Sequence, residues 1–194
     1  MEKIPIPSHY HDYASQTTSD ITSNIGFICV GLYILYKQQK ISLLAIHIIC
    51  IGIFSGYYHL QPTKERIVYD MLAVITTHII VLSYFLDTNT TMILYICSVF
   101  SVLYWKKYND LRLYILILVG APLYLLMKLH SNQKVNMYVY IFIAINITAR
   151  ILEYYDKDVY KLTNKRISGH TSKHLLGVIG LLVILQILIK LKKL

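Results

Sequence analysis

The stretch ISGHTSKHLLGVIGLLVILQILIKL, residues 167–191, decides the fold class of this chain. From His170 to Leu191 it is mainly apolar, and about 20 such residues in a helix cross the roughly 30 Å hydrocarbon core of a bilayer. Backbone polar groups in lipid must be satisfied internally, so a continuous apolar run of this length predicts a helix rather than a barrel strand. Two histidines, His170 and His174, stand at its start, and lysines stand at its end.

Six further apolar runs precede this one. The chain has 194 residues, 56% of them hydrophobic, and a soluble domain of this size could not bury so much apolar surface in one core. We therefore expect an all-α membrane protein, a seven-transmembrane helix bundle that is integral to the membrane and multi-pass. The predicted spans are Ile21–Tyr36, Ile41–Leu60, Ile67–Leu86, Thr91–Trp105, Leu111–Leu129, Val135–Leu152 and His170–Leu191.

A single domain, residues 1–194, is the simplest organisation, because no internal repeat or linker divides the chain. Residues 1–20 form a polar N-terminal segment without the basic tip and apolar core of a cleaved signal peptide. Residues 153–169 form the longest predicted loop. The distribution of Lys and Arg leans toward a cytosolic N-terminus by the positive-inside rule.

The formal net charge of +9 does not indicate nucleic-acid binding. The basic residues lie mainly in the connections between apolar runs, where membrane proteins place them against headgroups and water. The expected partners are the bilayer and a membrane lipid, and the oligomeric state is left open. Cys29, Cys50 and Cys97 lie within apolar runs without a paired pattern, so we expect buried thiols that act as small hydrophobes.

Seven crossings bring four polar residues to one face of the membrane. The end of the second span carries His59, the start of the third carries Asp70, and the start of the seventh carries His170 and His174. All three of these span ends lie on the same side as the N-terminus. Ionisable residues are costly in a bilayer, so those present are candidates for function.

Helical spacing gives these residues the pattern of a metal site. His170 and His174 are four residues apart and share a helix face, as do Ser55 and His59. A histidine pair at this spacing supplies two zinc ligands from one helix, and His59 would supply the third. Catalytic zinc keeps its fourth position for water. Asp70 can hold that water or take its proton, and Ser55 can donate a hydrogen bond to an oxyanion.

Other polar residues receive a plainer interpretation. We expect the remaining histidines to meet water or headgroups: His9, His11, His47, His78 and His130. Asp12 and Asp20 are interpreted as solvated or capping residues. Tyr57, Tyr58 and Tyr69 flank the candidate site and are candidates for lining a substrate-binding surface.

At these residues the chain resembles the alkaline ceramidase family and its wider CREST superfamily of seven-helix membrane hydrolases. Three stretches carry the resemblance: Tyr10–Ala14 with Thr22–Phe27, Ser55–Pro62 continuing to Asp70, and Ile167–Leu175. The resemblance implies zinc (Zn²⁺) held by His59, His170 and His174, with Ser55 and Asp70 assisting the attacking water. It also implies hydrolysis of the amide bond of ceramide-like lipids to a sphingoid base and a fatty acid.

The chain departs from the family pattern in two places. Tyr69 stands where family members often carry Trp, and Met71-Leu72-Ala73 replaces an Arg-Leu-Pro run. The N-terminal segment lacks the acidic calcium-binding pattern of the eukaryotic enzymes, so calcium is not expected. Two alternatives stay open: a receptor-like or non-catalytic member of the same superfamily with a structural zinc, and a transporter or scaffold whose histidines are incidental.

Overall fold

The structure is a computed structural model that describes residues 16–39 and 41–194. The described part is all-α, and six of its helical stretches are long and apolar enough to cross a membrane. This supports the predicted all-α, multi-pass membrane fold. His9, His11, Asp12 and the Tyr10–Ala14 part of the resemblance lie outside the described residues.

The helices run in chain order along the described residues. They are α1 (Gln16–Ser23), α2 (Ile25–Gln38), α3 (Leu43–Leu60), α4 (Lys64–Ser83), α5 (Thr88–Tyr108), α6 (Arg112–Leu129), α7 (Asn136–Tyr154), α8 (Asp156–Leu162) and α9 (Gly169–Lys190). Residues 18–38, which cover most of α1 and all of α2, count as one of the six membrane-length stretches; the others are α3, α4, α6, α7 and α9.

Helix α5 is the exception among the long helices. It has 21 residues but is not among the six stretches, because Thr and Asn fill its first turn and Lys106 and Lys107 its last. The predicted loop 153–169 also differs from the structure. It contains the short helix α8, whose first turn carries Asp156 and Asp158.

Side-chain caps fix where several helices begin. Ser42, Thr63, Asp87 and Ser168 have extended backbones, and each accepts a hydrogen bond from the backbone N–H three residues later. Such caps satisfy donors that the helix itself leaves free. Helix α4 therefore begins at Lys64, directly after Thr63 and three residues before the predicted start of the third span at Ile67.

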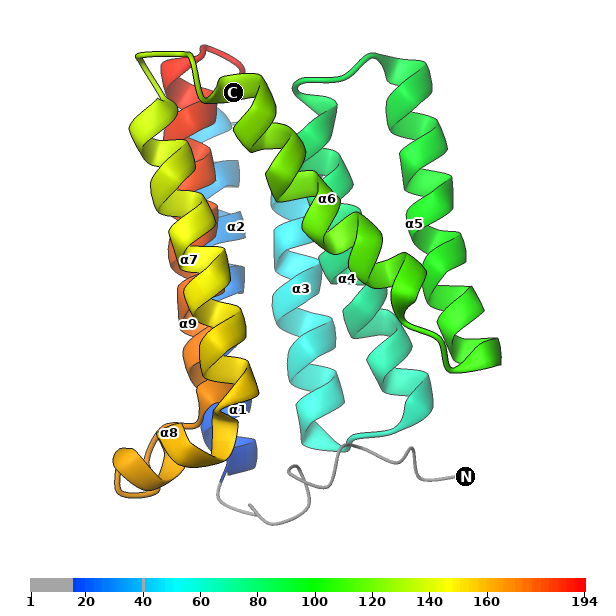
Figure 1. Cartoon of the computed structure of the whole chain (residues 1–194), viewed down its shortest axis with the longest axis vertical. Coiled ribbons are helices and arrows are strands. Elements are labelled where there is room, and N and C mark those ends of the chain that lie inside the picture. The colour runs from blue at the N-terminus through cyan, green and yellow to red at the C-terminus, as the bar shows by residue number, and fades with distance from the viewer. Residues whose placement is uncertain (1–15, 40) are drawn as a thin grey trace.

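The long helices stand side by side, with α1, α2, α7 and α9 on one side of the view and α3, α4, α5 and α6 on the other (Figure 1). Helix α6 crosses the others obliquely. Helices α2 and α3 pack closely at Gly52, where a Cβ atom would lie 2.8 Å from the carbonyl oxygen of Asn24. Helices α7 and α9 are also in extensive contact. By contrast, α3 and α4 have no Cα–Cα approach within 8 Å to α9.

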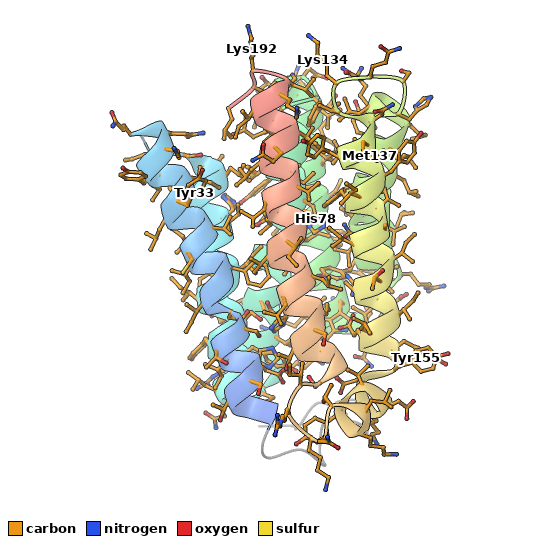
Figure 2. The ribbon with its side chains drawn as sticks, turned by 90° about the vertical axis from the view of Figure 1, so that its left-hand side faces the viewer. Tyr33, His78, Lys134, Met137, Tyr155 and Lys192 are labelled. Atoms are coloured by element: carbon orange, nitrogen blue, oxygen red, sulfur yellow. The ribbon has the colours of Figure 1, made fainter. Side chains whose placement is uncertain are left out.

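The end of α3, the start of α4 and the start of α9 all lie at the lower end of the bundle in Figure 1, where α8 also lies. The opposite end carries Lys134 and Lys192, and Tyr155 marks the lower end (Figure 2). The fold therefore brings together the three helix ends that carry the candidate ligands and Asp70.

Candidate metal centre and its cavity

Three buried histidines meet at the lower end of the bundle. His59, His170 and His174 are 5%, 6% and 6% exposed. The Nε2 atoms of His59 and His170 are 3.2 Å apart, and the ring centroids of the three pairs lie 4.6–5.2 Å from each other. One nitrogen from each ring lies within 4.8 Å of the others, so the group could hold a metal ion. The predicted ligand set is thus assembled in space.

The three rings bridge a gap between helices. Helices α3 and α9 have no Cα–Cα pair within 8 Å, and yet the ring of His59 lies against both rings of α9. The link between α3 and α9 at this level therefore runs through imidazole rings rather than through backbone packing. Helices α1 and α2 contact both α3 and α9 and hold them at this spacing.

The ring of His174 is oriented by a hydroxyl group of α1. Its Nδ1 atom lies 2.8 Å from Ser23 Oγ, and Ser23 in turn donates to the carbonyl oxygen of Asp20. A hydrogen bond at one imidazole nitrogen fixes the ring and leaves the other nitrogen, here Nε2, available as a metal ligand.

His170 has a charged environment on the side away from His59. Its Nδ1 atom lies 3.2 Å from Lys173 Nζ and 3.6 Å from Glu153 Oε1. Lys173 and Glu153 form an ion pair of 2.5 Å, and Arg150 binds the other oxygen of Glu153 at 2.7 Å. The carboxylate of Glu153 therefore joins α7 to α9 beside a candidate ligand.

The first turn of α9 is fixed by two buried carboxylates. Asp156 accepts the backbone N–H of His170 at 2.7 Å, and Asp20 accepts the hydroxyl of Thr171 at 2.5 Å. Carboxylates are favourable at a helix N-terminus. Asp20, interpreted from the sequence as solvated or capping, is a buried residue that binds this helix start. Gly169 is required here, because a Cβ atom would collide with the carbonyl oxygen of Leu152.

Asp70 and Ser55 line the cavity beside the histidines. Ser55 is buried one turn before His59, and its hydroxyl interacts with the carboxyl group of Asp70, which is also within electrostatic range of Lys173. The Oδ1 atom of Asp70 is buried and has no hydrogen-bond partner among the described residues. Buried polar atoms are nearly always paired, so an unpaired one indicates a place for a missing group.

These side chains form the polar end of a cavity of about 600 Å³. Ser55, Asp70, His170 and His174 line it, and helices α3 to α7 and α9 supply its mainly apolar wall. A volume of this size is typical of a small-molecule site. The cavity lies between α4 on one side and α7 and α9 on the other. No Cα atom of α4 comes within 8 Å of a Cα atom of α7 or α9.

The three tyrosines are separated by the structure. Tyr58 is buried and lines the cavity. Tyr57 and Tyr69 are exposed on the outer surface, where Tyr57 stacks against the guanidinium of Arg66 and Tyr69 packs against Phe54. Neighbouring positions on a helix point in different directions, so only one of Tyr57 and Tyr58 can face the cavity.

Several cavity residues were not singled out by sequence reasoning. Glu153 falls in the predicted loop 153–169 and Lys173 in the predicted seventh span, neither with an assigned role, and His78 is predicted at water or headgroups, whereas all three line the cavity. A signal for His78 existed. It stands eight residues after Asp70, so it lies on the same helix face. The cysteines are free as expected, but Cys29 and Cys97 are exposed rather than buried.

Comparisons of the chain with family models, curated proteins and solved structures find no match. The resemblance to alkaline ceramidases therefore stays a prediction from the motifs.

Proposed function

We propose that this protein is a zinc-dependent membrane hydrolase of the alkaline ceramidase type that cleaves the amide bond of ceramide-like lipids. The observation that carries the proposal is the group of three buried histidines, two of which line the polar end of a mainly apolar cavity beside a carboxylate with an unpaired oxygen. The products would be a sphingoid base and a fatty acid.

The proposal includes α5 as a seventh span. Its 21 residues correspond to about 31 Å of helix, enough for the hydrocarbon core. It packs against α4 and α6, and its polar first and last turns would reach the headgroups. With α5 counted, six crossings precede α9, so the start of α9 and the N-terminal end of α1 lie on the same side of the membrane.

Zinc is the metal that best fits the donor set. Three histidines with space for water are a common ligand set of catalytic zinc. Two nitrogens bound to one tetrahedral zinc at about 2.0–2.1 Å lie roughly 3.3 Å apart, and the Nε2 atoms of His59 and His170 lie 3.2 Å apart. The hydroxyl of Ser23 and the carboxylate of Glu153 stand at the other nitrogens of His174 and His170.

The surrounding residues suit amide hydrolysis. A bound zinc ion polarises a carbonyl group and lowers the pKa of water. Asp70 accepts the proton of the attacking water as the oxygen joins the carbonyl carbon, and it returns that proton to the nitrogen as the C–N bond breaks. Ser55 donates a hydrogen bond to the developing oxyanion. The apolar wall of the cavity accommodates an acyl chain, which suits a substrate that stays in the bilayer.

Metal content is the first test. Detergent-purified protein should contain about one zinc per chain, and both His59→Ala and His174→Ala should lose it. His47→Ala is the matched control, because His47 lies on α3 but does not line the cavity. Folded protein without zinc would refute the proposal.

Activity is tested with Asp70→Asn, which keeps the shape of the side chain but removes the proton acceptor. We expect the wild type to release fatty acid from a panel of ceramides, and Asp70→Asn to retain zinc while losing release by at least a hundredfold. Zinc-loaded wild type that releases no more fatty acid than His174→Ala would refute hydrolysis and favour the receptor-like alternative with structural zinc.

A further inference from the structure

A second set of polar side chains lines the same cavity away from the metal centre. Helix α4 contributes His78, and helix α7 contributes Asn146. His78 is eight residues beyond Asp70, which corresponds to about 12 Å along a helix. It lies near mid-height of the bundle, between the end marked by Tyr155 and the end marked by Lys134 (Figure 2). Polar side chains at this depth need a partner or a function.

The hydrogen bonds of these two side chains determine what they offer to a ligand. His78 Nδ1 lies 2.8 Å from the carbonyl oxygen of Val74. A carbonyl oxygen only accepts, so Nδ1 carries the proton and Nε2 of the neutral ring is an acceptor. Asn146 Nδ2 donates one of its two N–H groups to the carbonyl oxygen of Phe142 at 2.8 Å, which leaves its Oδ1 as an acceptor and its second N–H as a donor. Two acceptors therefore stand in the wall of an apolar cavity.

Two donors on the same helices have other acceptors. Thr77 donates to the carbonyl oxygen of Ala73 at 2.7 Å, and Arg150 binds Glu153. An acceptor in an apolar wall is costly to desolvate unless a donor reaches it. A plain acyl chain carries no donor, whereas a chain with a hydroxyl group does. The depth of His78 matches the middle of a long chain whose carbonyl group lies at Asp70.

We propose that His78 and Asn146 form a recognition site for a hydroxyl group carried part-way along the ligand's hydrocarbon chain. The inference rests on the proposed function, because it assumes that the cavity holds a lipid chain with its carbonyl end at the metal centre. It makes the protein selective for mid-chain hydroxylated lipids over their plain counterparts. A neutral hydrogen bond in such a site strengthens binding by about two- to tenfold.

The test compares two fatty acids that differ only in a mid-chain hydroxyl, ricinoleic acid and oleic acid. Each displaces radiolabelled oleic acid from zinc-loaded wild-type protein in detergent. We expect ricinoleic acid to bind about fivefold more tightly. In His78→Leu and Asn146→Leu the ratio of the two affinities should fall to about one. Both variants should still bind oleic acid and retain zinc, which shows that they fold.

His47→Leu is the matched control. His47 Nδ1 makes the same contact with the carbonyl oxygen four residues earlier, at 2.9 Å, but the residue does not line the cavity. The ricinoleic acid preference should survive in this variant. A fatty acid with its hydroxyl next to the carboxyl group should show no dependence on His78.

Each other outcome has a distinct meaning. Equal binding of the two acids to the wild type, or a preference unchanged in both cavity variants, would overturn the recognition site while leaving the hydrolase proposal intact; in that case the two acceptors serve water. Failure of oleic acid itself to bind zinc-loaded wild type would refute the lipid-filled cavity, and this inference with it.

Discussion

Replacement of Gly169 by alanine should disrupt the candidate metal centre, although it substitutes none of the three histidines. The new Cβ atom would lie 2.7 Å from Asp156 Cα, whereas ordinary contact begins at 3.4 Å, and it would collide with the carbonyl oxygen of Leu152. The start of α9 or the α7–α8 junction must therefore move by at least the difference, 0.7 Å. A metal site tolerates errors of only about 0.2 Å in ligand distance, and His170 is the next residue.

We expect Gly169→Ala to weaken zinc binding by about ten- to a hundredfold, the range measured when the groups that orient metal ligands are disturbed. This corresponds to about 1.4–2.8 kcal/mol. Zinc affinity is measured by competition with a chromophoric chelator in detergent, and circular dichroism checks helix content. Gly169 has no positive φ that alanine would have to avoid, so any loss must come from the collision.

The control is Gly120→Ala on α6, where a Cβ atom would meet no other atom within 4 Å. This variant should bind zinc as the wild type does and melt at the same temperature or slightly above it. Equal zinc affinity in Gly169→Ala and Gly120→Ala would refute the reasoning, because it would mean that the start of α9 can shift without moving its histidines.

Three further predictions follow from individual contacts. Ser23→Ala removes the hydroxyl that orients the ring of His174 and should weaken zinc binding about tenfold or more. The control Thr22→Ala, at an exposed neighbour, should bind zinc as the wild type does. Equal zinc affinities of the two variants would contradict this prediction. Trp105, the only tryptophan of the chain, lines the cavity, so a brominated fatty acid should quench its fluorescence and excess oleic acid should restore it; quenching that oleic acid cannot reverse would place the fatty acid elsewhere. Hydrogen bonds from Arg112 lower the pKa of Asp110 from 3.8 to about 2. The stability that this carboxylate contributes is therefore present above pH 3.8 and lost as pH falls through about 2. In Arg112→Gln, the pKa of Asp110 measured by NMR titration should return toward its ordinary value.

The meeting of the three histidines that could hold a metal ion was predictable from the sequence, because two simple rules determine their position. The four-residue spacing puts His170 and His174 on one helix face, and alternating crossings put His59 at the same end of the bundle. Neither rule needs knowledge of how the helices pack. The same holds for Ser55, which is one turn from His59.

The inner part of the cavity could not be predicted in this way. Whether His78 faces lipid, a neighbouring helix or a cavity depends on the rotation of α4 about its axis, which tertiary packing sets. The contact of Glu153 with Lys173 depends on the packing of α7 against α9, residues 20 apart in sequence. The helix α8 was missed because a short polar helix has no apolar face long enough to give a periodic signal.

The distance in sequence between the two halves of the metal centre has a consequence for biosynthesis. His59 and His170 are 111 residues apart, which at ordinary translation rates means a delay of about 6–20 s between their synthesis. During that interval His59 lacks the other two histidines of the group, because both lie on α9. Under the proposed function, metal loading must therefore follow the synthesis of α9, and a chain truncated before α9 would carry no complete site, so bound zinc would mark the molecules in which α9 has been made.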